Sequence, residues 1–164
     1  MSQTLDGVLQ AEGDGAAVRF QRDYPTGVHD LWAAITEPER VARWFDRVSG
    51  DLRPGGRVTV HFDDGPADFE VVTCEPPTVL ATRWLHASSH SLVTARLTPL
   101  APDCTRLVVE HTALTQRSAP DYAAGWHYYL DALGAALDGA PRPGWDEHFL
   151  PLLAGYRAQV TKQS

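Results

Sequence analysis

The stretch that decides the fold is SAPDYAAGWHYYLDALGAALDG, residues 118–139. Its apolar side chains recur every three or four positions, the period of a helix with one face against a protein core. Ser118 can cap such a helix, Gly139 is a typical terminator, and Pro141 and Pro143 prevent its continuation. We therefore expect a long amphipathic helix whose apolar stripe consists of Tyr122, Trp126, Tyr129, Leu130, Leu133 and Leu137.

The region before this helix alternates between apolar and polar residues and is divided by short turn signals. Arg53-Pro54-Gly55-Gly56, for example, is typical of a hairpin. No helical pattern separates the strands, which disfavours parallel βαβ units. We expect an antiparallel meander of six strands over residues 48–52, 57–62, 69–73, 79–85, 92–100 and 106–114, with a turn at 87–89 among others.

One strand and two short helices are expected ahead of the meander. Residues 16–24 alternate like a strand, and Thr26 is placed to cap a first helix over 28–35. Residues 36–39, TEPE, resemble a capping box that opens a second helix. The order β-α-α-β6-α predicts an α+β fold in which a curved antiparallel sheet is covered by the long helix. Such an arrangement generally leaves a cavity between sheet and helix.

Length and composition suit one such domain in a chain of 164 residues. We expect it to span residues 16–139, after a flexible start over 1–15 and before a tail over 140–164. The tail carries apolar residues at helical spacing, and Pro151 favours a short helix that begins near residue 151 rather than near 146.

The charge pattern excludes several partners. The formal net charge is −7 and no basic run is present, which argues against nucleic acid because phosphate binding needs clustered Lys and Arg.

Apolar runs are far shorter than the ~20 residues of a membrane span, so no membrane insertion is expected. Cys74 and Cys104 lack metal-motif spacing, and the polar first residues lack a secretory pattern. A cytoplasmic protein with free thiols is expected.

Several strings resemble the helix-grip superfamily called SRPBCC, START-like or Bet v-like. Within it, the chain is most similar to the activator of heat shock protein 90 ATPase homologue-like family. The resemblance covers roughly residues 16–139 and does not extend to the tail. It implies the helix-grip fold, and it leaves the function open between co-chaperones, binders of lipid or polyketide-type ligands, and members without assigned activity. The strings that carry it are VHDLWAAITEPE (28–39), Trp44-Phe45, GDLRPGG (50–56), CEPP (74–77), Trp84 and GWHYYLDAL (125–133).

Strand parity and the helix stripe supply a candidate cavity lining. Leu107, Val109 and His111 share one strand face, and Val93, Ala95 and Leu97 share one on the strand before. These faces should point to the long helix. His111 is either a satisfied core residue or a hydrogen-bond donor or general base for a ligand. The residues we expect to contact a ligand are Trp44, Phe45, Phe69, Trp84, His111, Trp126, Tyr129 and Leu133.

Three functions remain open at this stage. The first is a module that holds a small hydrophobic or aromatic molecule between sheet and helix. The second, implied by the resemblance, is a regulator of a chaperone or another ATPase through protein contact. The third is a cyclase, dehydratase or hydrolase that uses His111 or His61 with Arg83 or Arg96. His86 and His90 flank a turn without zinc-ligand spacing, so we expect no metal and no cofactor. Monomer and homodimer both remain open.

Overall fold

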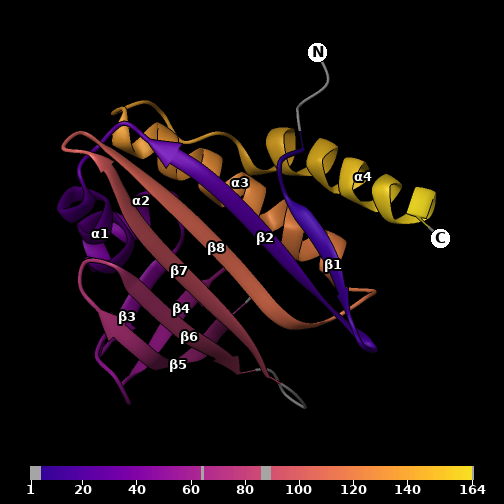
Figure 1. Cartoon of the computed structure of the whole chain (residues 1–164), viewed down its shortest axis with the longest axis horizontal. Coiled ribbons are helices and arrows are strands. Elements are labelled where there is room, and N and C mark those ends of the chain that lie inside the picture. The colour runs from indigo at the N-terminus through magenta and orange to yellow at the C-terminus, as the bar shows by residue number, and fades with distance from the viewer. Residues whose placement is uncertain (1–4, 64, 86–89, 164) are drawn as a thin grey trace.

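The computed structural model describes residues 5–63, 65–85 and 90–163, with backbone only for residues 161–163. Asp64, His86 and the expected turn at 87–89 therefore lie outside the described residues. Figure 1 shows the helices and strands, which are β1 (Val8–Glu12), β2 (Gly15–Tyr24), α1 (Val28–Thr36), α2 (Pro38–Trp44), β3 (Arg47–Gly50), β4 (Arg57–Phe62), β5 (Gly65–Glu75), β6 (Val79–Leu85), β7 (His90–Ala101), β8 (Cys104–Thr115), α3 (Ala119–Leu137) and α4 (Trp145–Gln163).

The strands form one curved sheet in the order β1-β2-β8-β7-β6-β5-β4-β3, and every neighbouring pair is antiparallel. The predicted meander is confirmed as β3 to β8, and the pairing of β2 with β8 brings the early strand back beside the last one. In Figure 1, α3 lies against the sheet and α4 runs along the other side of α3. The predicted α+β helix-grip fold is confirmed.

The predicted strand faces are also confirmed. Leu107, Val109 and His111 of β8 are almost completely buried, as are Val93 and Leu97 of β7. The indole N–H of Trp126 on α3 donates to Nδ1 of His111 over 3.0 Å, so this face of β8 points to α3. The sheet, α1, α2 and α3 therefore enclose a common core, in which the candidate site lies.

The start of the chain differs from the sequence-based expectation. Where an irregular segment was expected, β1 pairs with β2 from Val8↔Arg19 to Glu12↔Gly15. Gly13 forms the hairpin turn with φ +57°, a conformation that favours glycine. Most β1 side chains are exposed, so this edge strand lacks the apolar alternation by which a strand is recognised.

The tail helix also begins earlier than expected, at Trp145 rather than near residue 151. Pro151 lies inside α4, where it removes one backbone hydrogen bond. Aromatic contacts offset that cost: Trp145 meets Tyr128 of α3 edge-on with ring centroids 4.7 Å apart, and within α4 it stacks on Phe149 at 4.3 Å. The expectation was wrong because tertiary packing stabilises the turn before the proline.

The short helices begin as expected but without the predicted side-chain caps. Gly27, rather than Thr26, stands at the N-cap of α1, and Glu37 stands at that of α2. The Thr26 hydroxyl donates to Asp30, and the Thr36 hydroxyl donates back to the carbonyl of Trp32. Pro38 does occupy the first turn of α2, as predicted.

Candidate ligand-binding site

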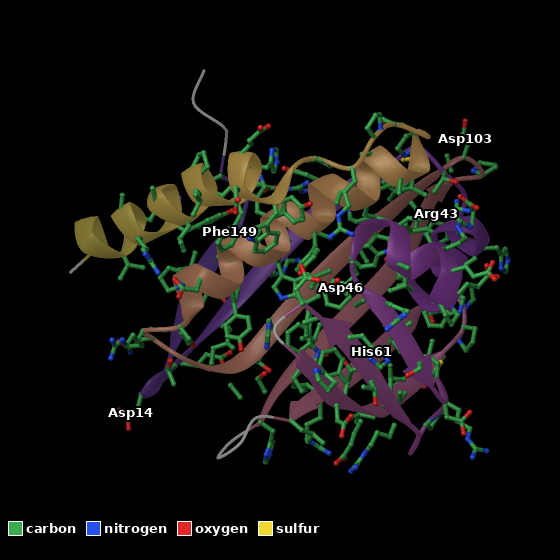
Figure 2. All side chains as sticks on the ribbon, turned by 180° about the vertical axis from the view of Figure 1, so that it is seen from behind. Asp14, Arg43, Asp46, His61, Asp103 and Phe149 are labelled. Atoms are coloured by element: carbon green, nitrogen blue, oxygen red, sulfur yellow. The ribbon has the colours of Figure 1, made fainter. Side chains whose placement is uncertain are left out.

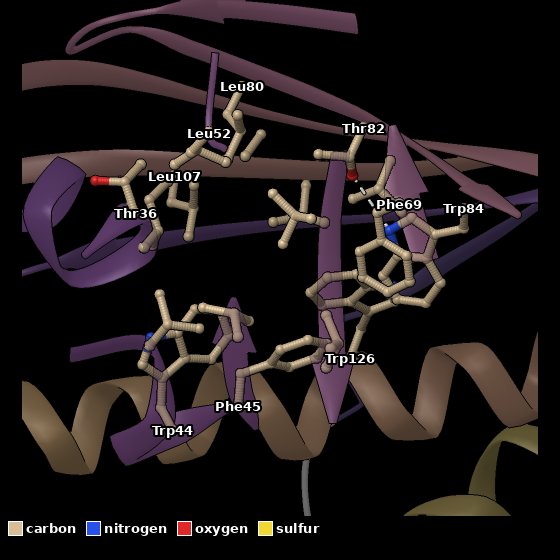
Figure 3. A pocket seen from close by; sticks show the side chains of 18 of the residues that line it. Thr36, Trp44, Phe45, Leu52, Phe69, Leu80, Thr82, Trp84, Leu107 and Trp126 are labelled. Atoms are coloured by element: carbon tan, nitrogen blue, oxygen red, sulfur yellow. Dashed lines mark hydrogen bonds between the residues drawn. The ribbon is translucent and has the colours of Figure 1, made fainter. Parts of the chain in front are cut away.

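An apolar cavity of about 120 Å³ lies between the sheet and α3, and we call it the inner cavity. Figure 3 shows its side chains around an open space. One wall comes from β4 to β8, the opposite wall comes from Trp126 and Leu130 of α3, and α1 and α2 close one end with Ile35, Val41 and Trp44. Its lining residues are Ile35, Thr36, Val41, Trp44, Phe45, Val48, Leu52, Val58, Val60, Phe69, Leu80, Thr82, Trp84, Val93, Ala95, Leu107, Val109, Trp126 and Leu130.

Three tryptophans line the inner cavity, and the protein satisfies the indole N–H of each. Trp44 donates to the carbonyl of Ala34 over 2.8 Å, which also ties α2 to α1. Trp84 donates to the hydroxyl of Thr82 over 3.2 Å, the dashed line in Figure 3. Trp126 donates to His111. A molecule in the cavity therefore meets the carbon surface of these rings rather than their polar edges.

The rest of the lining is equally poor in polar groups. Among its described residues Thr36 and Thr82 are the only polar ones apart from the tryptophans, and the hydroxyl of Thr36 is already bonded to a carbonyl. None of these described lining residues carries an ionisable group. The inner cavity thus favours apolar atoms and offers no side chain for acid-base or nucleophilic chemistry.

A second hollow, the outer cleft, has a volume of about 590 Å³ and shares two side chains of its lining, Phe69 and Trp84, with the inner cavity. Their rings stack with centroids 4.6 Å apart and planes 7° apart, and we call this pair the aromatic partition. The outer cleft is lined by Asp46, Phe62, Asp63, Ala67, Phe69, Trp84, Leu85, Tyr122, Tyr129, Arg142 and Trp145.

The outer cleft is more polar than the inner cavity. Figure 2 shows Asp46 between α3 and the strands. Its carboxylate accepts a long, 3.5 Å hydrogen bond from the hydroxyl of Tyr129. Burial, and next the negative charge of Asp46, raise the pKa of Tyr129, so this phenol stays protonated at neutral pH. Arg142 donates to the carbonyl of Phe45 over 2.8 Å and to the hydroxyl of Tyr128 over 3.1 Å.

The predicted ligand contacts divide into three groups. Trp44, Phe45, Phe69, Trp84 and Trp126 line the inner cavity, and Tyr129 lines the outer cleft. His111 and Leu133 line neither. The cleft residues Asp46, Phe62, Arg142 and Trp145 were not predicted from the sequence. The predicted apolar stripe on the long helix already included Tyr122, so its spacing alone could have added that residue to the site.

His111 is fully buried behind Trp84, whose ring meets the imidazole edge-on at a centroid distance of 4.7 Å. Because an indole N–H can only donate, Nδ1 accepts from Trp126 and the neutral ring carries its proton on Nε2. Nε2 lies 2.8 Å from the hydroxyl of Ser91. Both nitrogens are thus used within the core, where His111 orients Trp126 from behind the cavity wall.

The geometry that an enzyme based on histidine and arginine needs is not assembled. His61 contacts Ser49 over 3.0 Å, and Arg83 pairs with Glu70 over 3.1 Å. Neither they nor Arg96 lines the inner cavity or the outer cleft. Within the described ranges, no group of three or more His, Cys, Asp and Glu side chains is arranged to hold a metal ion.

A cluster of ionisable side chains, not predicted from the sequence, lies on the opposite side of α3. We call it the polar cluster, and it consists of Asp6, Arg22, His127, Asp131, His148 and Tyr156. Arg22 makes a two-pronged bond to Asp6 and a second bond to Asp131. His148 of α4 donates to Asp131 over 2.7 Å. The cluster thus joins the start of the chain, β2, α3 and α4.

His127 lies at the centre of the polar cluster and is only 4% exposed. The hydroxyl of Tyr156 accepts from the backbone N–H of Gly7 and makes a second hydrogen bond, over 2.9 Å, with Nδ1 of His127. Burial lowers the pKa of His127 below its usual value. Burial alone would raise the pKa of Asp131, but hydrogen bonds from His148 and Arg22 outweigh it and lower that pKa. The mutual pairing indicates a structural role.

The curved sheet closed by a long helix around an apolar cavity defines a helix-grip protein. A family model agrees with this geometry, and its match covers residues 25–138. The chain belongs to the family described as activator of Hsp90 ATPase homolog 1-like protein. The matched residues include α1, α2, the meander and α3, but not α4.

Solved structures extend the similarity over the whole chain. CalU16 from Micromonospora echinospora is 27% identical, with 97% of this chain and 99% of that chain covered and a TM-score of 0.79. DynU16, described as a putative protein in the dynemicin biosynthetic locus, is 30% identical with a TM-score of 0.71. That similarity covers 81% of this chain but only 51% of DynU16.

A more distant structure shows the fold alone. The Aha1 dimer from Colwellia psychrerythraea is 17% identical, with 74% of this chain and 95% of that chain covered and a TM-score of 0.66. No curated protein matches the chain. In the part of the chain that the structure describes, no helix is both long and apolar enough to cross a membrane.

Proposed function

We propose that this protein binds a small apolar or aromatic molecule in the inner cavity. The observation that carries the proposal is a cavity of about 120 Å³ whose three indole N–H groups are all bonded to the protein. A packed interior normally fills such a space with side chains. Here rigid rings from α2, β6 and α3 line it instead.

The size of the inner cavity sets the size of the group that it accepts. An apolar cavity of about 150 Å³ engineered in another protein stays dry and binds benzene. The inner cavity is therefore matched to a single ring or a short branched alkyl group. Drug-sized ligands need roughly 300 Å³ or more, so a larger molecule must extend out of the inner cavity.

The lining supports binding rather than turnover. It has no acid, base or nucleophile, and His111 contributes to the wall only through Trp126 and Trp84. The similarity to DynU16, from a biosynthetic locus, is consistent with a small-molecule ligand. We infer that the protein holds its ligand without transforming it.

Calorimetric titration with benzene, toluene and indole tests this proposal. We expect benzene and toluene to bind the wild-type protein and Ala95→Leu to abolish the binding, because Ala95 lines the cavity and a leucine there fills it. The matched control is Ala11→Leu on the exposed edge strand β1, which should bind like wild type. Equal binding by Ala95→Leu and wild type would refute the proposal.

The alternative function is regulation of an Hsp90-class ATPase, which the family description suggests. A continuous exposed apolar patch on the tail helix would favour it. α4 does expose Trp145, Leu150 and Val160, but these residues are separated by roughly 7.5 Å and 15 Å along the helix axis, and the exposed Arg157 lies between the last two. We therefore expect the ATP hydrolysis rate of a purified Hsp90 to stay unchanged when this protein is added. A clear acceleration would favour the alternative.

A further inference from the structure

The outer cleft combines six aromatic rings with an excess of negative charge. The rings are those of Phe62, Phe69, Trp84, Tyr122, Tyr129 and Trp145. The described charged residues in its lining are two carboxylates, Asp46 and Asp63, and one guanidinium, Arg142. The faces of aromatic rings are themselves negative, so rings and carboxylates together favour a cation.

Arg142 does not reverse this preference, because its guanidinium is directed at the protein. Nε donates to the hydroxyl of Tyr128, and Nη1 donates to the carbonyl of Phe45. The group also lies over the ring of Tyr128, 5.7 Å from its centroid. Arg142 thereby fastens the segment between α3 and α4 to the end of α2, which builds one side of the cleft.

The outer cleft and the inner cavity both have the aromatic partition in their linings. A ligand with a ring in the inner cavity that extends along Trp84 into the outer cleft therefore approaches Asp46 and the cleft rings. Trp84 stacks on Phe69 and packs against His111 and Trp126, so its ring forms a fixed wall that both hollows share. One elongated molecule that lies along this wall would place its two ends in the two hollows.

We propose that the outer cleft binds the ammonium group of an amphipathic amine whose apolar end occupies the inner cavity. This inference rests on the proposed function and specifies its ligand class. Asp46 contributes the ionic attraction, and the rings of Tyr129, Tyr122 and Trp145 contribute cation–π contacts. The amine thus supplies the positive charge that the cleft favours.

Three probes of equal length test the inference: phenylbutylamine, phenylbutanol and phenylbutyrate. At neutral pH the amine is positively charged, the alcohol is neutral and the acid is negatively charged. All three consist of a phenyl ring on a four-carbon chain. We expect wild type to bind the amine about tenfold more tightly than the alcohol, and the acid most weakly. In Asp46→Asn the affinity for the amine should fall severalfold more than the affinity for the alcohol, while the rings retain part of the preference.

Asp103→Asn is the matched control, because Asp103 is an exposed carboxylate in the turn between β7 and β8, away from Asp46 in Figure 2. Added salt should weaken binding of the amine but not of the alcohol, which tests the charge without any substitution. Alcohol binding with no preference for the amine would overturn this inference and leave the proposed function intact. Tighter binding of the acid would also overturn it. Binding by none of the three probes would overturn both proposals.

Discussion

The two sides of α3 differ in what fills the space beside them. Toward the meander, Trp126 and Leu130 border an apolar cavity without ionisable groups. Toward α4, His127 and Asp131 join a polar cluster in which each charged group has an opposite partner, and Leu152 and Tyr156 pack with no exposed surface. The comparison teaches that the α4 side stabilises the helix in place, which allows the meander side to leave space for a ligand.

The largest expected effect comes from breaking the polar cluster. Arg22→Met leaves the partly buried Asp131 without its cation, and we expect it to lower the free energy of unfolding by about 3 kcal/mol. Urea denaturation measures the loss. The control is Arg106→Met, which removes an exposed pair with Asp23 and should have a much smaller effect. Equal losses would contradict a structural role for the polar cluster.

The next prediction compares one substitution, alanine to leucine, at a fully packed position of α3 and at the wall of the inner cavity. Ala124 is fully buried in α3, and Ala124→Leu should lower the free energy of unfolding by about 1–3 kcal/mol through overpacking. Ala95→Leu fills the inner cavity and should raise it by about 0.5–2 kcal/mol. Thermal denaturation of the two variants measures the difference. A loss of stability in both would mean that the space near Ala95 is already filled.

A smaller effect is the pH dependence of the stability that His127 and Asp131, on the α4 side of α3, contribute. The folded-state pKa of His127 is lowered, so folding favours the neutral imidazole. This residue therefore contributes its full stabilisation at pH values above ~6.5, the usual histidine pKa, and the contribution declines as the pH falls below that value. The lowered pKa of Asp131 adds a further loss below the usual aspartate value near ~3.9. We therefore expect the melting temperature to fall on acidification from neutral pH.

His127→Gln should retain only part of the decline between pH 7.5 and pH 5, because this variant has no imidazole to protonate at that position. The control is His29→Gln, which changes an exposed histidine and should keep the full decline. Melting curves at several pH values give the comparison. An unchanged decline in His127→Gln would mean that the pH dependence arises elsewhere.

The fold was predictable because its signals are local. The turns around Pro54 and Pro102 and the stripe on residues 118–139 each depend on neighbours in sequence. The two elements that were misjudged depend on distant partners: β1 pairs with β2 through its backbone, and the first turn of α4 packs on Tyr128. Local patterns cannot report such contacts.

The sequence predicted which side chains point toward the cavity side of the sheet and helix, but not which of them reach the cavity itself. Strand parity and helix spacing put Val93, Val109 and Trp126 on the cavity side, where the structure has them. The same rules put His111 there too, although it lies one layer behind Trp84. The outer cleft joins Asp46 to Arg142 and Trp145, far apart in sequence, so no spacing pattern indicated it. That the lining residues contact a ligand stays a prediction.

The measurement that tests the central claim most directly is the methyl ¹H–¹³C spectrum of the protein titrated with benzene. We predict that ring-current shifts appear at the methyl groups of Val60, Val109 and Leu130, which line the inner cavity. The methyl groups of Leu133 and Leu152, buried outside the cavity lining, should keep their positions. Shifts confined to Leu133 and Leu152, or no shift in any of these methyl groups, would contradict the account.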